Sequence, residues 1–344
     1  MNKILIIGLG LIGGSFAKAL RQHKIAREIW AFDTNIATIN SAKTSGTIDG
    51  FAVIDDNIKS FDLVVIATPL SSYKDIFQKL SAINPQNTVI IDLGSLKEFA
   101  LTTLPENLKQ NFVACHPIAG SDKTGFENAS ATLFLDKKFV ICKGKTTAEK
   151  SVKIVENLAH KIGGKPDFID AKLHDEIYAL ISHLPQFLSF LTREFSPEKQ
   201  ENDFIKTAFR LDNSSAEIWE DIFKINRKNL QKFYLEFFDN LTNFATMIRK
   251  KEYTKLLTEL KNIQPTTNID HDFAKIMDAK IIFRLIIVAS YLKIKKINSL
   301  NIYAGSGFRD FTSIILLLKS EKNFLQFLER EQKEVLSFIR KIST

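Results

Sequence analysis

The stretch that decides the fold stands at the start of the chain: Lys3-Ile4-Leu5-Ile6-Ile7-Gly8-Leu9-Gly10-Leu11-Ile12-Gly13-Gly14. An apolar, β-branched run that leads through G-x-G-x-x-G into a helical pattern is typical of a dinucleotide-binding βαβ unit. Gly8 permits the tight turn, Gly10 lets a pyrophosphate approach the backbone, and Gly13 lets the helix pack closely on the strand. The first turn of that helix, from Leu11 and Ile12 onward, presents N–H groups and a positive dipole end to the phosphates.

Two further positions extend this predicted cofactor site. Asp33 follows the second apolar run, 20 residues after Gly13. A carboxylate there accepts hydrogen bonds from the adenosine ribose and repels a 2′-phosphate, which predicts NAD rather than NADP. Thr68 and Pro69 follow the third run and are expected to face the same cofactor. The alternative is a glycine-rich turn that binds no ligand.

The rest of the chain divides by its hydrophobic pattern. Up to about residue 164, short apolar runs alternate with helical patterns, which predicts a Rossmann-type, doubly wound parallel sheet. After that, apolar residues follow helical spacing, in the segments Ala171–Phe195 (broken or kinked at Pro185), Glu217–Lys250, Phe273–Tyr291 and Ser313–Ile342. We therefore predict an NAD-binding domain over residues 1–164 and an all-α domain for substrate binding and dimerisation over residues 165–344.

The composition bears on which partners and which location are expected for the protein. The 344 residues are 45% hydrophobic and 25% charged, with a formal net charge of +8 whose Lys and Arg are scattered among acids. This favours a solvated basic surface over a nucleic-acid partner. The two cysteines have no metal-ligand spacing, so no metal is expected. With neither a leader-like start nor an apolar stretch long enough to span a bilayer, the expected location is cytoplasmic, with no membrane partner.

Polar residues at the ends of the apolar runs are the catalytic candidates. In an open parallel sheet the carboxyl ends of the strands frame the ligand crevice. His116 ends the run that starts at Phe112, and a His there can take a hydroxyl proton while hydride leaves the same carbon. Ser95, after the run ending at Asp92, is placed to hydrogen-bond that His or the substrate. A turn-capping role for His116, before Pro117, is the alternative.

Taken together, these motifs resemble the prephenate dehydrogenase family of tyrosine biosynthesis, which also includes arogenate dehydrogenases. The resemblance covers about residues 1–250 and rests on five motifs in order: Gly8-Leu9-Gly10-Leu11-Ile12-Gly13-Gly14-Ser15, Asp92-Leu93-Gly94-Ser95-Leu96-Lys97, His116-Pro117-Ile118-Ala119-Gly120, Ser182-His183-Leu184-Pro185, and Arg210 nine positions before Trp219. It implies oxidative decarboxylation of prephenate to 4-hydroxyphenylpyruvate with reduction of NAD⁺. It also implies a homodimer, with tyrosine as a possible inhibitor.

The resemblance also implies roles for single residues. His116 falls on the catalytic hydrogen-bond acceptor and Ser95 on its supporting serine. Arg210 falls on the arginine that anchors a substrate carboxylate, a task that suits a guanidinium fork. The expected substrate pocket is completed by His183, Gln186, Ser121 and Asp122, of which Asp122 would accept the ammonium of arogenate if that were the substrate.

Two departures from the family pattern stand out. Gln186 stands where the family often has a second His, so the pocket loses a group that carries charge. The glycine-rich lead-in expected before Arg210 is absent there but appears later, as Gly305-Ser306-Gly307-Phe308-Arg309-Asp310-Phe311-Thr312, with Ser313 at the arginine position. This suggests that residues 265–344 form a degenerate second helical unit, a chance resemblance being the alternative.

Three other functions remain open from the sequence. An arogenate dehydrogenase differs only in the substrate side chain. A 3-hydroxyacid-type dehydrogenase shares the two-domain plan, although it relies on a Lys in the helical domain that nothing here indicates. In a non-enzymatic NAD-sensing protein, His116 and Arg210 would be incidental.

Overall fold

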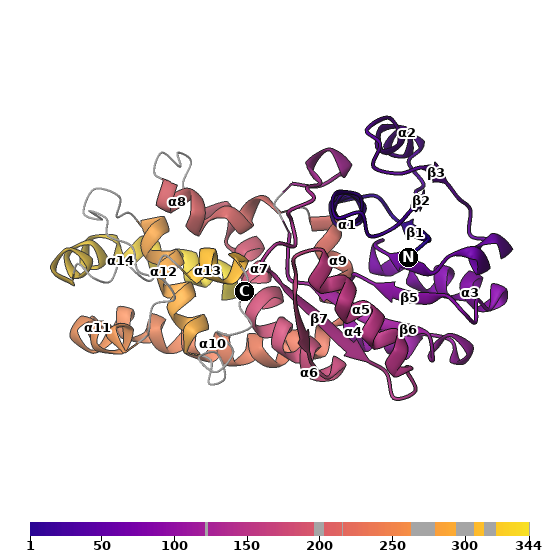
Figure 1. The fold of residues 1–344 in the computed structure, drawn as a ribbon. Coiled ribbons are helices and arrows are strands. Elements are labelled where there is room, and N and C mark those ends of the chain that lie inside the picture. Colours follow the sequence, from indigo (N-terminus) through magenta and orange to yellow (C-terminus); the bar gives the residue numbers. More distant parts are fainter. Residues whose placement is uncertain are drawn as a thin grey trace. The chain divides into compact units, whose positions relative to one another are not determined.

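The computed structural model of the chain describes residues 1–120, 123–195, 203–214, 216–262, 279–293, 306–312 and 321–343 (Figure 1). These residues form two compact units. The first unit comprises residues 1–175 and 216–225, and the second comprises residues 176–215 and 226–344. Among the described residues, no helix is both long and apolar enough to cross a membrane.

The first unit is built on one eight-stranded sheet with the order β3-β2-β1-β4-β5-β6-β7-β8. The strands are β1 (Lys3–Ile7), β2 (Glu28–Phe32), β3 (Gly50–Phe51), β4 (Leu63–Ile66), β5 (Val89–Asp92), β6 (Phe112–Pro117), β7 (Lys138–Lys143) and β8 (Lys165–Phe168). The part 3-2-1-4-5-6 is the order of a doubly wound dinucleotide-binding fold, whose ligand crevice lies where the strand order reverses, between β1 and β4. The predicted fold class is confirmed.

The central strands are buried because helices cover the sheet. β1 from Ile4 onward and all of β4 are apolar and buried, and the two strands pair in parallel, with Ile4 opposite Leu63. The helices of this unit are α1 (Leu11–Gln22), α2 (Ile36–Thr44), α3 (Tyr73–Ile83), α4 (Lys97–Thr103), α5 (Glu149–Lys161), α9 (Ala216–Ile225) and most of α6 (Ala171–Tyr178). Near-continuous apolar strands are what a sheet shielded on both faces requires.

The edge of the sheet differs from the expectation in two ways. β7 runs antiparallel to β6, with Cys115 opposite Ile141, whereas the sequence pattern predicted parallel strands throughout. β8 pairs with β7, with Lys138 opposite Lys165, so residues 165–168 belong to the sheet and not to the helical half. The run Lys165–Phe168 was not predicted as a strand because it is short, carries Pro166 and is only half-buried, which is typical of an edge strand.

The second unit is helical in its described residues. Its elements are the π-helical turn η5 (Ala179–His183), α7 (Leu184–Leu191), the 3₁₀ turn η6 (Arg193–Phe195), α8 (Asp203–Ala208), the 3₁₀ turn η7 (Arg210–Asn213), α10 (Arg227–Arg249), α11 (Tyr253–Lys261), α12 (Ala279–Leu292), α13 (Ser306–Thr312) and α14 (Glu321–Ser343). The expected break near Pro185 takes the form of the π turn, and Pro185 itself lies in the first turn of α7, where a missing N–H costs little. The long helix expected over Glu217–Lys250 is divided at Asn226.

Candidate active site

The loop between β1 and α1 has a backbone conformation that depends on its glycines. Gly8 has a φ of 93°, which other residues rarely adopt. A Cβ on Gly13 would lie 1.9 Å from the carbonyl oxygen of Gly8, so only glycine allows the helix this close. A Cβ on Gly10 would meet nothing within 4 Å. Gly10 caps α1 without a side-chain hydrogen bond, and the first turn carries no acid, which suits phosphate groups.

Asp33 lies just beyond β2 and is held against this loop. Its Oδ2 accepts a hydrogen bond from the backbone N–H of Leu9 at 2.7 Å, and its Oδ1 accepts one from Asn35 at 2.8 Å. The carboxylate is therefore oriented by the glycine loop before any ligand binds. This places it where an adenosine ribose is read in dinucleotide-binding folds.

The loop after β4 adds polar groups on the other side of the same turn. Thr68 Oγ1 is buried and has no hydrogen-bond partner among the described residues, and Thr68 Cγ2 would contact a Cβ built on Gly8. A buried hydroxyl without a partner costs free energy, which a ligand donor or acceptor would recover. Pro69 is exposed, and the following Ser71 donates its N–H to Asp221 of α9 at 2.9 Å.

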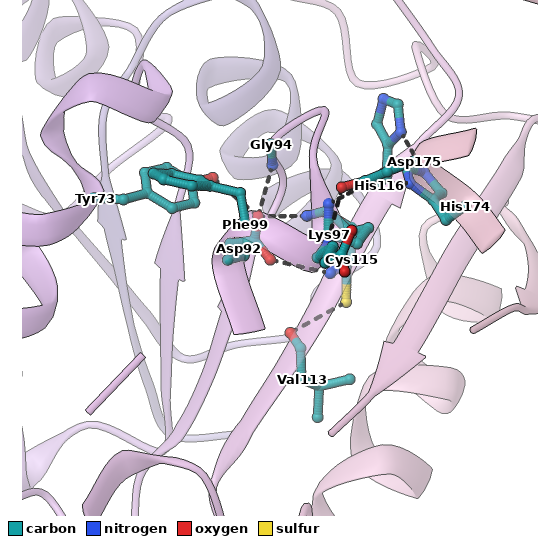
Figure 2. Close-up of polar contacts among 12 residues, drawn as sticks. Tyr73, Asp92, Gly94, Lys97, Phe99, Val113, Cys115, His116, His174 and Asp175 are labelled. Atoms are coloured by element: carbon teal, nitrogen blue, oxygen red, sulfur yellow. Dashed lines mark hydrogen bonds and ion pairs between the residues drawn. The ribbon is translucent and has the colours of Figure 1, made fainter. Parts of the chain in front are cut away.

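His116, near the end of β6, stands at the head of a hydrogen-bonded chain of three residues (Figure 2). Its Nδ1 lies 2.9 Å from Nε2 of His174, and Nδ1 of His174 lies 2.8 Å from Oδ1 of Asp175. His174 is buried, whereas His116 is only half-buried. Asp175 is itself fixed, because it accepts the backbone N–H groups of Lys97 at 2.8 Å and Glu98 at 3.0 Å at the start of α4.

This chain fixes the tautomer of His116. Burial, with a smaller contribution from the charge of Lys97, holds the pKa of His174 well below its ordinary value, so His174 is neutral. Its Nδ1–H donates to the Asp175 carboxylate, which leaves the lone pair of His174 on Nε2. His116 must then donate from Nδ1 to that lone pair. The lone pair of His116 consequently lies on Nε2, and this ring nitrogen is the one suited to accept a substrate proton.

A second buried network holds the strand ends on which the site is built. Lys97 Nζ forms an ion pair with Asp92 and donates to the carbonyl oxygen of Cys115 at 2.5 Å. Asp92 also accepts from the hydroxyl of Tyr73 at 2.9 Å and from the N–H of Cys115 at 3.2 Å. Burial raises the pKa of Asp92, and the Lys97 charge opposes that shift. Because the pair joins β5, β6 and α4, it fixes the backbone that carries His116 (Figure 2).

The other residues that the sequence predicts in the first unit are Ser95, Ser121 and Asp122. Ser95 is half-buried after β5 and makes no hydrogen bond to His116 in the part of the chain that the structure describes. Ser121 and Asp122 lie outside the described residues. No group of three or more His, Cys, Asp or Glu within the described ranges is arranged to hold a metal ion.

The residues expected in the second unit make hydrogen bonds to other residues of that unit. His183 is buried in the π turn, where its Nδ1 lies 3.1 Å from Nδ2 of Asn226. Gln186 is also buried: its amide donates to the carbonyl oxygen of Leu211 at 2.8 Å and accepts from the hydroxyl of Ser214 at 3.1 Å. Both ends of this amide are used to hold the turn that carries Arg210.

Arg210 is the first residue of that turn and forms an ion pair with Asp310, which lies 100 positions later in the sequence. Its Nε and Nη2 both donate to Oδ2 of Asp310, at 2.7 and 2.6 Å. Two residues further on, Asp212 is buried and accepts hydrogen bonds from Nη2 of Arg284 at both carboxylate oxygens, at 2.6 Å each, and from the hydroxyl of Ser189. The guanidinium of Arg284 lies 4.5 Å from the ring of Phe209. Arg210 and Asp310 are partly exposed, whereas Arg284 and Asp212 are buried.

Sequence reasoning missed His174, Asp175, Asp310 and Arg284. His174-Asp175 starts 58 residues after His116, inside a helix whose pattern predicted only packing. A His–Asp dipeptide shortly before the Ser182-His183-Leu184-Pro185 motif was the available signal. Nothing in the sequence indicated that Arg210 pairs with an acid 100 positions away.

Comparison with known proteins places these motifs in a family. Residues 16–167 match the model described as prephenate dehydrogenase, nucleotide-binding domain, and residues 170–262 match prephenate dehydrogenase, dimerization domain. The cyclohexadienyl dehydrogenase of Zymomonas mobilis is 26% identical over 284 residues, covering 78% of this chain and 97% of that protein. The prephenate dehydrogenase of Bacillus subtilis is 26% identical over 278 residues, covering 76% of this chain and 74% of that protein.

A solved structure gives the same result. The prephenate dehydrogenase of Aquifex aeolicus, in complex with hydroxyphenyl propionate and NAD⁺, is 30% identical and has a TM-score of 0.69. The match covers 76% of this chain and 96% of that one. The chain belongs to the prephenate dehydrogenase family of oxidoreductases.

Proposed function

We propose that the protein is an NAD⁺-dependent prephenate dehydrogenase, which converts prephenate to 4-hydroxyphenylpyruvate and CO₂ in tyrosine biosynthesis. The observation that carries this proposal is the chain from Asp175 through His174 to His116, because it orients one ring nitrogen of His116 as a proton acceptor at the carboxyl end of β6. The family assignment supports the substrate class, and the hydrogen-bonded chain supports His116 as the group that acts on it.

NAD⁺ fits the first unit. The open space over Gly10, the uncapped start of α1 and the Asp33 carboxylate suit the pyrophosphate and the ribose. Thr68 Oγ1 offers a buried hydroxyl to the same ligand. The Aquifex relative binds NAD⁺, which supports this choice. NAD⁺ held by these residues would supply the acceptor for the hydride of the hydroxyl-bearing ring carbon.

His116 accepts the hydroxyl proton through Nε2 as the hydride departs. The charge that then forms on the imidazolium is stabilised through Nδ1–H by the Nε2 lone pair of His174 and, behind it, by the Asp175 carboxylate. Because the pKa of His174 is depressed, the proton stays on His116. His174 and Asp175 thus act as positioning residues, the role that an acid behind a catalytic histidine has in hydrolases.

Arg210 is proposed to anchor a substrate carboxylate. The contact with Asp310 uses one N–H on Nε and one on Nη2, so about three of the five guanidinium N–H groups face other directions. Asp310 holds the planar group in one orientation, which lowers the entropy lost when a carboxylate binds. Gln186 supports the same turn through Leu211 and Ser214.

Prephenate is favoured over arogenate because the formal net charge of +8 suits the more anionic substrate. The test is kcat/KM for both substrates in the native protein and in Asp122→Asn. We expect a preference for prephenate in both proteins. A preference for arogenate that disappears in Asp122→Asn would overturn this choice and identify Asp122 as the partner of the ammonium.

A further inference from the structure

His183, which the family resemblance assigns to the substrate pocket, lies in an unusual element of the second unit. It is the last residue of the π turn η5, and its side chain is buried. Single π turns within helical segments are rare and occur often at functional sites. Nδ1 of the His183 ring lies 3.1 Å from Nδ2 of Asn226, the residue directly before α10.

The orientation of the Asn226 amide decides which of these two partners donates. Nδ2 of Asn229 donates to Oδ1 of Asn226 at 2.9 Å, so the amide oxygen points toward Asn229 and the amide nitrogen toward His183. An amide nitrogen is a donor and offers no lone pair to a hydrogen bond. His183 must therefore accept at Nδ1, which makes its ring neutral, with its one hydrogen on Nε2.

Burial makes this tautomer persistent. His183 is 2% exposed and Asn226 is 7% exposed, so the contact between them is shielded from water. A ring with its hydrogen on Nδ1 would place two donors face to face at this point. Buried donors without an acceptor cost free energy, so the second tautomer is disfavoured.

Asn226 makes this contact in place of the one that its position favours. It is the N-cap residue of α10, where asparagine is preferred because its oxygen accepts from backbone N–H groups of the first turn. Among the described residues its side chain makes no such capping hydrogen bond. The oxygen accepts instead from the side chain of Asn229, in that same turn. The helix thus forgoes a stabilising cap, and His183 gains an oriented donor.

We propose that Asn226, oriented by Asn229, is a positioning residue that keeps His183 in the tautomer that donates from Nε2 to an oxygen of the substrate. This inference rests on the proposed function, because prephenate offers carboxylate and keto oxygens to such a donor. It also gives His116 and His183 different tasks. His116 carries its hydrogen on Nδ1 and accepts the hydroxyl proton at Nε2, whereas His183 has no lone pair at Nε2 with which to accept it.

The tautomer is measurable in the full chain without substrate. NMR of the protein with isotope-labelled histidine rings separates a ring nitrogen that bears a hydrogen from one that bears a lone pair. We expect the native His183 to carry its hydrogen on Nε2 and its lone pair on Nδ1. In Asn226→Asp a carboxylate replaces the amide and accepts from Nδ1, as the acid of a hydrolase triad does, so the lone pair should move to Nε2. A hydrogen on Nδ1 in the native protein would overturn the inference, whether or not the variant folds.

The kinetic test uses the same variant and a matched control. Asn226→Asp should raise KM for prephenate roughly 10–150-fold, the effect of losing a hydrogen bond to a charged group, with kcat near its native value. Asn240→Asp makes the same change elsewhere on α10, where Nδ2 donates to the carbonyl oxygen of Ser290 at 3.1 Å, and should leave KM unchanged.

Two kinetic results would contradict the role of the tautomer in substrate binding. One is a native KM in a folded Asn226→Asp protein whose tautomer has changed. The other is an equal rise of KM in Asn226→Asp and Asn240→Asp, which would reflect a general disturbance of α10. Absence of prephenate turnover by the native protein would instead refute the proposed function, and the NMR result on His183 would stand apart from it.

Discussion

The two units hold their polar side chains in opposite ways. In the first unit, fixed groups orient a further side chain: Asp175 and His174 orient His116, and the backbone N–H of Leu9 orients Asp33. In the second unit, the charged groups satisfy one another, as Arg210 does with Asp310 and Arg284 with Asp212. Under the proposed function, the first unit carries the group that accepts the proton, and the second unit carries the arginine that anchors the substrate.

This difference predicts where substitutions act. Under the proposed function, changes to His116 and His174 should affect kcat while substrate binding is kept, because these residues act on the reacting atoms. Changes to Arg210 should affect KM. The following predictions, in order of decreasing effect, test that division.

Removal of the proton acceptor should have the largest effect. We expect His116→Asn to lower kcat by roughly 10²–10⁴-fold, the usual contribution of a general base, with little change in the affinity for NAD⁺. Steady-state kinetics with prephenate and calorimetric titration with NAD⁺ would measure the two quantities. A folded His116→Asn protein with a near-native kcat would remove His116 from the mechanism.

Loss of the anchoring arginine should affect KM. A hydrogen bond to a charged group contributes about 1.5–3 kcal/mol, so Arg210→Gln should raise KM for prephenate roughly 10–150-fold. The matched control is Arg309→Gln, an exposed arginine on α13, which should leave KM unchanged. If Arg309→Gln gave the large effect, Arg210 would not be the arginine that anchors the substrate.

The positioning role of His174 should be visible in kcat alone. His174→Phe keeps a ring of similar size but cannot accept from His116, and we expect kcat to fall about 10–100-fold, as when orienting partners of functional histidines are removed. KM should stay near its native value, and His174→Gln, whose carbonyl can accept the same hydrogen bond, should recover part of kcat. Equal kcat in the Phe and Gln variants would show that the hydrogen bond is not what matters.

The depressed pKa of His174 also predicts a pH dependence of stability. The unfolded chain binds a proton at this residue as the pH falls through about 6.5, whereas the folded protein does not. Stability present above that pH is therefore lost below it, by about 1.4 kcal/mol per pH unit for one group. Denaturant unfolding between pH 6.5 and pH 5 should show a shallower loss in His174→Gln than in the native protein. Parallel curves would mean that His174 is already protonated in the folded state.

The parts of the molecule that the sequence predicts are those set by local patterns. The glycine loop and Asp33 lie within one βαβ unit, and His116 follows from its place at a strand end. The pairs that complete the site are long-range: 58 residues separate His116 from His174, and 100 separate Arg210 from Asp310. Such pairs depend on how helices pack, which hydrophobic periodicity does not specify. The half-buried edge strand β8 was not predicted for a related reason, because so short a strand is defined by its pairing with β7 and not by its own sequence pattern.

The most direct measurement is a single turnover with the native protein in excess over prephenate and with NAD⁺ present. Our account predicts that NADH, 4-hydroxyphenylpyruvate and CO₂ form in equal amounts and at one rate, because hydride loss and decarboxylation aromatise the same ring. His116→Asn under the same conditions should form all three more slowly and in the same proportions. NADH formed without CO₂, or no NADH while prephenate and NAD⁺ are both bound, would contradict the account.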